Sequence, residues 1–104
     1  MAADLIVDVY IYPTELSGRA DSLGEGCPCV CLHDRDKFEG WDCHLLLGGR
    51  PLKPGERRRI EISLVSGIVG ASVLRAFGRF YLWDSRVFGE AVVVAQIPTA
   101  QNSN

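Results

Sequence analysis

The sequence predicts an all-β fold, a small barrel of about six short strands. Three observations lead to this prediction. Apolar and polar residues alternate along several segments, which is the pattern of strands with one buried face. Eleven glycines and five prolines in 104 residues indicate many turns. No segment shows a sustained helical pattern, and closing a sheet into a barrel removes its exposed edges.

The length allows one domain, which we expect at residues 1–97 with a flexible polar tail at residues 98–104. Hydrophobic residues make up 47% and charged residues 23%, as in globular proteins. A net charge of −2 argues against a protein that binds nucleic acid through bulk charge alone. No apolar run approaches the ~18 residues of a membrane span, and the N-terminus lacks a basic signal region, so we expect cytoplasmic residence and no membrane partner. The glycine motifs of P-loop GTPases and Rossmann domains are absent from the sequence.

The first strand is predicted at residues 5–12. Leu5, Val7, Val9 and Ile11 share one face of this segment, and Ile6, Asp8, Tyr10 and Tyr12 share the other. β-branched and aromatic residues dominate the segment. Pro13 ends the strand, because proline cannot donate to the ladder. Polar residues and glycines then predict an irregular loop over residues 14–26.

Two further strands are predicted at residues 27–32 and 41–47. The charged segment between them, residues 33–40, predicts an exposed loop. Gly48 and Gly49 end the third strand. A type II turn follows at Pro54 and Gly55, since proline presets φ for the first central position and glycine accepts the positive φ of the second.

The second half of the chain is predicted to add three strands. The clearest alternation in the sequence predicts a strand at residues 59–64. Residues 65–76 are ambiguous, because Gly67 and Gly70 disfavour a helix, and at most one helical turn is expected near their end. Residues 80–83 and 87–97, joined by a tight turn, predict a hairpin.

Four motifs stand in order along the chain. The first strand is followed by E-L-S-G-R at residues 15–19, and a P-G-E turn at residues 54–56 precedes the clearest strand. The chain closes with G-R-F-Y-L at residues 78–82 and R-V-F-G-E-A-V-V at residues 86–93. In this order and spacing, the chain resembles the C-terminal, third domain of elongation factor Tu over roughly residues 5–97.

The resemblance implies a six-stranded antiparallel Greek-key barrel. In the factor, this domain helps to hold the T stem of aminoacyl-tRNA and binds the exchange factor. The GTPase domain and the second barrel have no counterpart here, so the resemblance implies a binding surface rather than GTP hydrolysis or tRNA delivery. Arg19 matches the arginine of the family's G-G-R motif, in the region that faces tRNA, and Arg86 matches the arginine of its final motif. Ser17 and residues 26–29 depart from the family pattern.

Cysteines form the most distinctive cluster of residue types. Cys27, Cys29 and Cys31 alternate, so their side chains share one face of a strand, and Cys43 and His44 follow. Thiolates and imidazoles bind zinc, but C-x-C on a strand separates the sulfurs by about 7 Å, which fits structural zinc poorly. We therefore predict no cofactor and no metal, with the cysteines buried in the barrel. A metal- or thiol-based function centred on this cluster, and a disulfide between strands, are the alternatives.

The charges are unevenly distributed. Residues 1–49 hold three Lys/Arg against nine Asp/Glu, whereas residues 50–86 hold eight against three. A basic stripe of this kind can meet phosphates or an acidic partner, and the alternative is a solvated sheet edge protected by charge. The predicted stripe comprises Arg50, Lys53, Arg57, Arg58 and Arg59, extended by Arg19, Arg75, Arg79 and Arg86.

An aromatic surface is predicted beside this stripe. Arg79, Tyr81 and Trp83 share one face of their strand, opposite Phe80 and Leu82, and form a contact surface if that face points outward. The sequence holds no recognisable catalytic motif, so we predict a non-enzymatic binding module that contacts a protein or RNA. A homodimer formed through a sheet edge is a further alternative.

Overall fold

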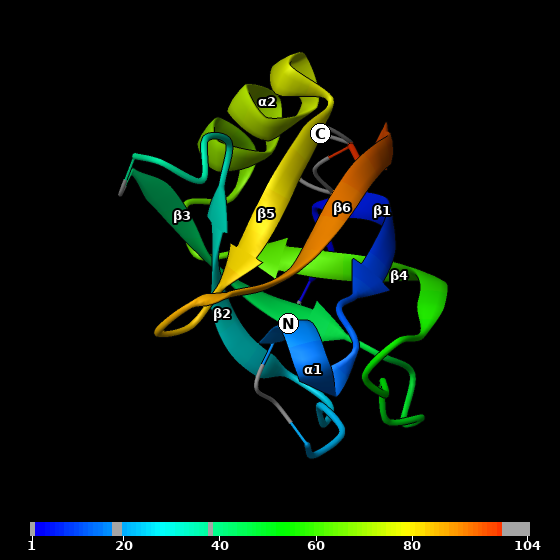
Figure 1. The fold of residues 1–104 in the computed structure, drawn as a ribbon. Coiled ribbons are helices and arrows are strands. Elements are labelled where there is room, and N and C mark those ends of the chain that lie inside the picture. Colours follow the sequence, from blue (N-terminus) through cyan, green and yellow to red (C-terminus); the bar gives the residue numbers. More distant parts are fainter. Residues whose placement is uncertain (1, 18–19, 38, 99–104) are drawn as a thin grey trace.

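The computed structural model describes residues 2–17, 20–37 and 39–98. Six strands and two helices follow one another along this part of the chain (Figure 1). The elements are β1 (Leu5–Ile11), α1 (Thr14–Ser17), β2 (Cys27–Leu32), β3 (Gly40–Leu46), β4 (Arg57–Leu64), α2 (Ile68–Phe77), β5 (Arg79–Trp83) and β6 (Val87–Gln96). The predicted residue Arg19 and the predicted tail beyond Pro98 lie outside the described residues.

The strands form a closed antiparallel barrel, which confirms the predicted fold class. Their order around the barrel is β1-β4-β3-β2-β5-β6, and β6 returns to pair with β1. The pair β1/β6 therefore lies across the barrel from the pair β2/β3. Side chains on β1 and β6 are therefore far around the barrel from the cysteines on β2 and β3.

The alternation of inward and outward side chains along each strand determines which residues form the core. In β1, the side chains of Leu5, Val7, Val9 and Ile11 are all buried, while those between them are partly or fully exposed. The same inward faces on the other strands close one hydrophobic core, with Phe80 and Phe88 as its largest fully buried side chains. Closure of the sheet gives these apolar side chains a common interior.

The turn at Gly55 has the predicted conformation, and the β5/β6 hairpin has its tight turn at the predicted place. Gly55 has φ of 84°, as a type II turn requires, and the Glu56 N–H donates to the Lys53 carbonyl at 3.0 Å. The Gly55 N–H donates to the Ile11 carbonyl at 2.8 Å, which ties this turn to the end of β1. Ser85, also with positive φ, lies in the tight turn of the β5/β6 hairpin.

The expectation that residues 65–76 form no sustained helix was wrong. The ten-residue helix α2 lies there, with Gly67 at its N-cap rather than within it. Gly78 ends the helix in the left-handed conformation, donating its N–H to the Leu74 carbonyl. A Cβ at Gly70 would lie 3.1 Å from the Trp41 ring, so glycine lets the helix pack closely on the barrel. Burial of Ala71 and Leu74 therefore outweighs the low helix propensity of the glycine.

The predicted loop over residues 14–26 also begins with one helical turn, α1. Leu23 in this loop is buried and pairs with Leu52 as an isolated bridge, which closes one end of the barrel. Among the described residues, neither helix is long and apolar enough to cross a membrane.

Candidate functional site

The register of four neighbouring strands places one row of outward side chains across the barrel. Arg57 on β4 stands opposite Tyr10 on β1, Tyr10 opposite Glu90 on β6, and Glu90 opposite Tyr81 on β5. Because side chains opposite each other on one face of a sheet are neighbours, the row is continuous. With Tyr12 and Arg35, which contact this row, we call it the tyrosine face.

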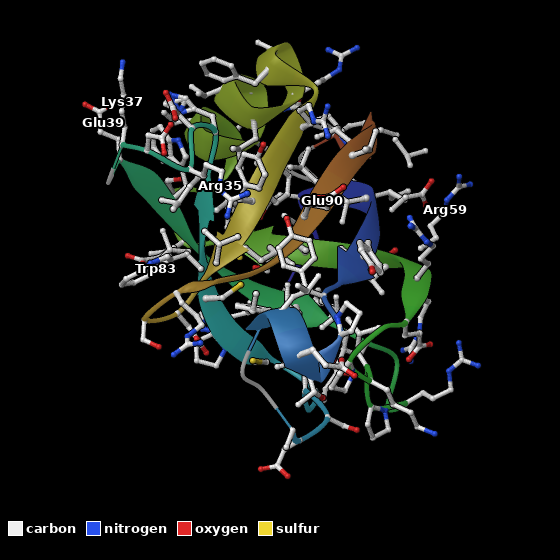
Figure 2. All side chains as sticks on the ribbon, viewed as in Figure 1. Arg35, Lys37, Glu39, Arg59, Trp83 and Glu90 are labelled. Carbon is white, nitrogen blue, oxygen red and sulfur yellow. The ribbon has the colours of Figure 1, made fainter. Side chains whose placement is uncertain are left out.

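Cations cover the rings at both ends of the tyrosine face. The Arg57 guanidinium lies 4.1 Å from the centre of the Tyr10 ring, and that of Arg35 lies 5.4 Å from the centre of the Tyr81 ring. Both distances are within the range of cation–π attraction. Figure 2 shows Glu90 on β6 between Arg35 on one side and Arg59, toward β4, on the other. The face thus reads arginine, tyrosine, carboxylate, tyrosine, arginine.

Tyr12 and Glu90 hold the centre of this face. The Tyr12 hydroxyl donates to Glu90 Oε1 at 2.9 Å, and the rings of Tyr10 and Tyr12 meet edge to face at 5.6 Å. Partial burial, together with the hydrogen bond to the Glu90 carboxylate, raises the pKa of Tyr12 to about 12. The hydroxyl therefore stays protonated at neutral pH and keeps the Glu90 carboxylate in one orientation.

The adjacent row contains an exposed ion pair and an apolar residue. Arg59 Nε and Nη2 donate to the two oxygens of Asp8 at 2.8 and 3.1 Å. The hydrogen bond and charge of Arg59 hold the pKa of Asp8 below its ordinary value, and Asp8 raises that of Arg59. Val92, half exposed, stands opposite both Asp8 and Arg79. A shallow pocket of about 370 Å³ lies over these two rows on β1, β4 and β6.

Arg58 serves the turn before β4 rather than the open surface. Its guanidinium donates to the Glu56 carboxylate and to the carbonyls of Arg50 and Pro51 at 2.7–2.9 Å, and its side chain is only 11% exposed. The Glu56 carboxylate also accepts the Lys53 N–H at 3.0 Å, and this bond, with the charge of Arg58, lowers the pKa of Glu56. Arg50 and Lys53 themselves are exposed beside this turn.

The predicted aromatic surface on β5 does point outward. Phe80 and Leu82 are buried, while Arg79 is exposed and Tyr81 and Trp83 are partly exposed. Tyr81 joins the tyrosine face, but Trp83 stands opposite Val30 on β2 and away from Glu90 in Figure 2. Arg86 is exposed in the β5/β6 turn.

Four residues of the tyrosine face were not among the predicted site residues: Tyr10, Tyr12, Arg35 and Glu90. The two tyrosines share the outward side of the first strand, so alternation alone could have shown that they point together. Their approach to Glu90 depends on the pairing of β1 with β6, which no local pattern encodes.

The cysteines lie on the opposite side of the barrel and point inward. Cys29, Cys31 and Cys43 are buried, whereas Cys27 is partly exposed. The Cys29 and Cys43 sulfurs are 3.4 Å apart, and Cys31 Sγ donates to Cys43 Sγ at 3.1 Å. We call these three buried residues the sulfur cluster. The partly exposed His44 follows Cys43 in β3 and takes the other side of the strand.

Burial shapes the chemistry of the sulfur cluster. It raises the pKa of Cys31, against the opposing effect of the contact with Cys43. For Cys43, the contact with Cys29 favours the thiolate, but the contact with Cys31 and burial outweigh it and raise the pKa well above its ordinary value. Over the described part of the chain, no group of three or more His, Cys, Asp or Glu is placed to hold a metal ion.

Comparison with known proteins adds no relative. The chain matches neither a protein-family model nor a curated protein. The fold and the chemistry of the tyrosine face are therefore the basis for the function proposed next.

Proposed function

We propose that the chain is a non-enzymatic binding module that binds a protein partner through the tyrosine face. The observation that carries the proposal is the continuous row Arg57–Tyr10–Glu90–Tyr81 across four strands, with Arg35 over its last ring. Tyrosine and arginine are the residue types enriched where proteins bind one another most strongly. The supporting strands also hold these side chains in place before binding, which lowers the ordering cost.

The charge pattern favours a protein over RNA. Two arginines of the predicted basic stripe are already neutralised, Arg58 by Glu56 and Arg59 by Asp8. The Glu90 carboxylate stands in the middle of the face and would repel a phosphate backbone. A protein surface with acidic groups near Arg35 and Arg57, and a donor or cation near Glu90, complements this arrangement.

The resemblance to the third domain of elongation factor Tu supports the same class of function. In that factor the domain is a barrel that binds aminoacyl-tRNA and the exchange factor. The resemblance thus makes a partner from the translation apparatus the first to test.

Differential capture with face variants tests the proposal. Tagged wild-type protein, the double variant Arg57→Glu/Tyr81→Ala and the control Arg86→Glu are incubated with lysate, with and without nuclease treatment, and bound proteins are quantified by mass spectrometry. Arg86 is exposed and belongs to the same predicted basic stripe, but lies in a turn outside the face. We expect at least one partner whose recovery falls at least about tenfold in the double variant and stays unchanged in the control.

Two results would contradict the proposal. One is recovery that disappears with nuclease treatment and falls in Arg86→Glu as much as in the double variant. Such recovery would indicate binding to RNA through charge alone. Equal recovery of every captured protein by the double variant and the wild type would remove the tyrosine face as the binding surface. Circular dichroism of each variant confirms that the barrel is intact.

A further inference from the structure

The sulfur cluster is the strongest chemical feature outside the tyrosine face. Cys43 on β3 contacts two cysteines of β2, with its sulfur 3.4 Å from that of Cys29 and 3.1 Å from that of Cys31. A disulfide bond is about 2.0 Å long, so a shift of little more than 1 Å brings Cys43 within bonding distance of either sulfur.

The strand register distinguishes between the two pairs. Cys29 stands directly opposite Cys43, whereas Cys31 stands opposite Trp41 and lies diagonally from Cys43. Directly opposed residues have Cα atoms about 4.5–5.5 Å apart, within the range that a disulfide spans. Diagonal neighbours are typically about 7–8 Å apart, which is too far for a bridge without backbone movement.

Access from solvent favours the same pair. Cys29 and Cys43 both line a surface pocket of about 380 Å³, together with Asp42, His44 and Trp83. Cys31 is fully buried and is not part of that lining. A small oxidant that enters the pocket therefore reaches Cys29, at 6% exposure the most accessible of the three, before it reaches Cys31.

We propose that Cys29 and Cys43 form a reversible disulfide when the protein meets a peroxide. In the first step, the Cys29 sulfur attacks one peroxide oxygen; the O–O bond breaks, and Cys29 becomes a sulfenic acid while one water leaves. In the second step, the Cys43 sulfur displaces the hydroxyl group, the S–S bond forms, and a second water leaves. Two thiols are thereby oxidised by two electrons, and one hydrogen peroxide is reduced to two waters.

The surroundings make this a slow, conditional modification. Thiolates are the reactive form. The contact with Cys29 favours the Cys43 thiolate, but the contact with Cys31 and burial outweigh it and raise the pKa of Cys43. Cys29 is the more exposed sulfur of the pair and is therefore the first to be oxidised, and Cys43 resolves the sulfenic acid. A thiol reductant restores the starting state, as expected for a disulfide that forms only under oxidising conditions.

The bridge would join β2 to β3 and close the chain between residues 29 and 43. This segment contains the charged loop after β2, including Arg35 of the tyrosine face. Closing a loop of this size restricts the unfolded chain, so we expect the midpoint of thermal unfolding to rise by about 10 °C.

Mass spectrometry of the oxidised wild-type protein tests the proposal without any substitution. After treatment with hydrogen peroxide, we expect an intact mass lower by about 2 Da, restored by dithiothreitol. Tryptic cleavage after Arg35 and Lys37 separates Cys43 from the cysteines of β2, and fragmentation of the linked peptides identifies the bonded residue. Cys29→Ala and Cys43→Ala should lose the 2 Da change, whereas the matched controls Cys27→Ala and Cys31→Ala should keep it.

Three results would overturn the proposal. One is a bridge mapped to Cys27 or Cys31. Another is a mass increase from oxygen addition with no linked peptide. The third is an unchanged mass after prolonged peroxide treatment. None of these results bears on the tyrosine face, whose capture test includes no peroxide treatment, so the two proposals can fail separately.

Discussion

The two sides of the barrel place their distinctive side chains on opposite surfaces of one sheet. On the β1/β6 side, the tyrosines and Glu90 point outward, and large apolar side chains such as Phe88 fill the interior. On the β2/β3 side, the small sulfur-bearing side chains of Cys29 and Cys43 point inward. The same period-two alternation therefore builds the outward tyrosine face on one side and the inward sulfur cluster on the other.

The backbones of the paired strands approach each other closely on both sides of the barrel. On the β1/β6 side, a Cβ at Gly89 would lie 2.8 Å from the Tyr10 carbonyl oxygen, and on the β2/β3 side a Cβ at Gly40 would lie 2.9 Å from the Cys31 carbonyl oxygen. Both strand pairs thus depend on a glycine next to the residues of interest. The difference between the two sides lies in the side chains rather than in the closeness of the strands.

The largest expected effect compares buried side chains that the two sides contribute to the core. Phe88→Ala on β6 removes a fully buried aromatic ring and should lower the free energy of unfolding by about 4 kcal/mol. Cys31→Ala on β2 removes one sulfur atom at an equally buried position and should cost about 1 kcal/mol. Urea unfolding of both variants measures the difference. Similar losses in the free energy of unfolding would contradict this expectation and would mean that the two sides are packed alike.

The second expected effect concerns the approach of β6 to β1. Gly89→Ala should lower the free energy of unfolding by about 2 kcal/mol, because the new methyl group meets the backbone of Tyr10 rather than a movable side chain. Gly24→Ala is the matched control, since a Cβ there meets nothing within 4 Å and Gly24 is exposed. Urea unfolding should show a change of less than about 0.5 kcal/mol for that control. An unchanged free energy of unfolding in Gly89→Ala would show that β1 and β6 can move apart without a loss of stability.

Local alternation explains why the six strands could be predicted to within about two residues. The segment from Leu5 to Ile11 shows the pattern, because each inward residue is apolar and two of the three outward residues, Asp8 and Tyr10, are more polar. Helix α2 could not be predicted in this way, since its stability depends on Gly70 packing against Trp41, far away in the sequence. Tertiary contact outweighed local propensity there.

The candidate site was predictable only in part, for the same reason. Tyr81 was singled out from its own strand and Arg57 from the distribution of charge, but the row that joins them requires β1 between β4 and β6. The arginines of the basic stripe look equivalent in sequence, and only the fold shows that Arg58 is held by Glu56 and two carbonyls. Likewise, the C-x-C spacing places Cys29 and Cys31 on one face, whereas Cys43 meets them through the β2/β3 register.

The smallest expected effect tests whether the β1/β6 side is held together by its outward polar contacts as well as by its core. Tyr12→Phe removes only the hydroxyl that donates to Glu90, so the free energy of unfolding near pH 8 should fall by about 1 kcal/mol. The pKa of Tyr12 is raised to about 12 in the folded protein, against an ordinary value near 10. A raised folded-state pKa means that this contribution is fully present below pH ~10 and is lost as the pH rises toward 12.

Urea unfolding of the wild type and of Tyr12→Phe at pH 8 and near pH 11 measures this contribution. Every other side chain is the same in the two proteins, so the difference between the two profiles isolates the Tyr12 hydroxyl. We expect the stability advantage of the wild type to shrink at the higher pH. Parallel profiles would mean that the Tyr12 hydroxyl does not contribute to the free energy of unfolding. The tyrosine face would then be held in place by the buried side chains of β1 and β6 alone.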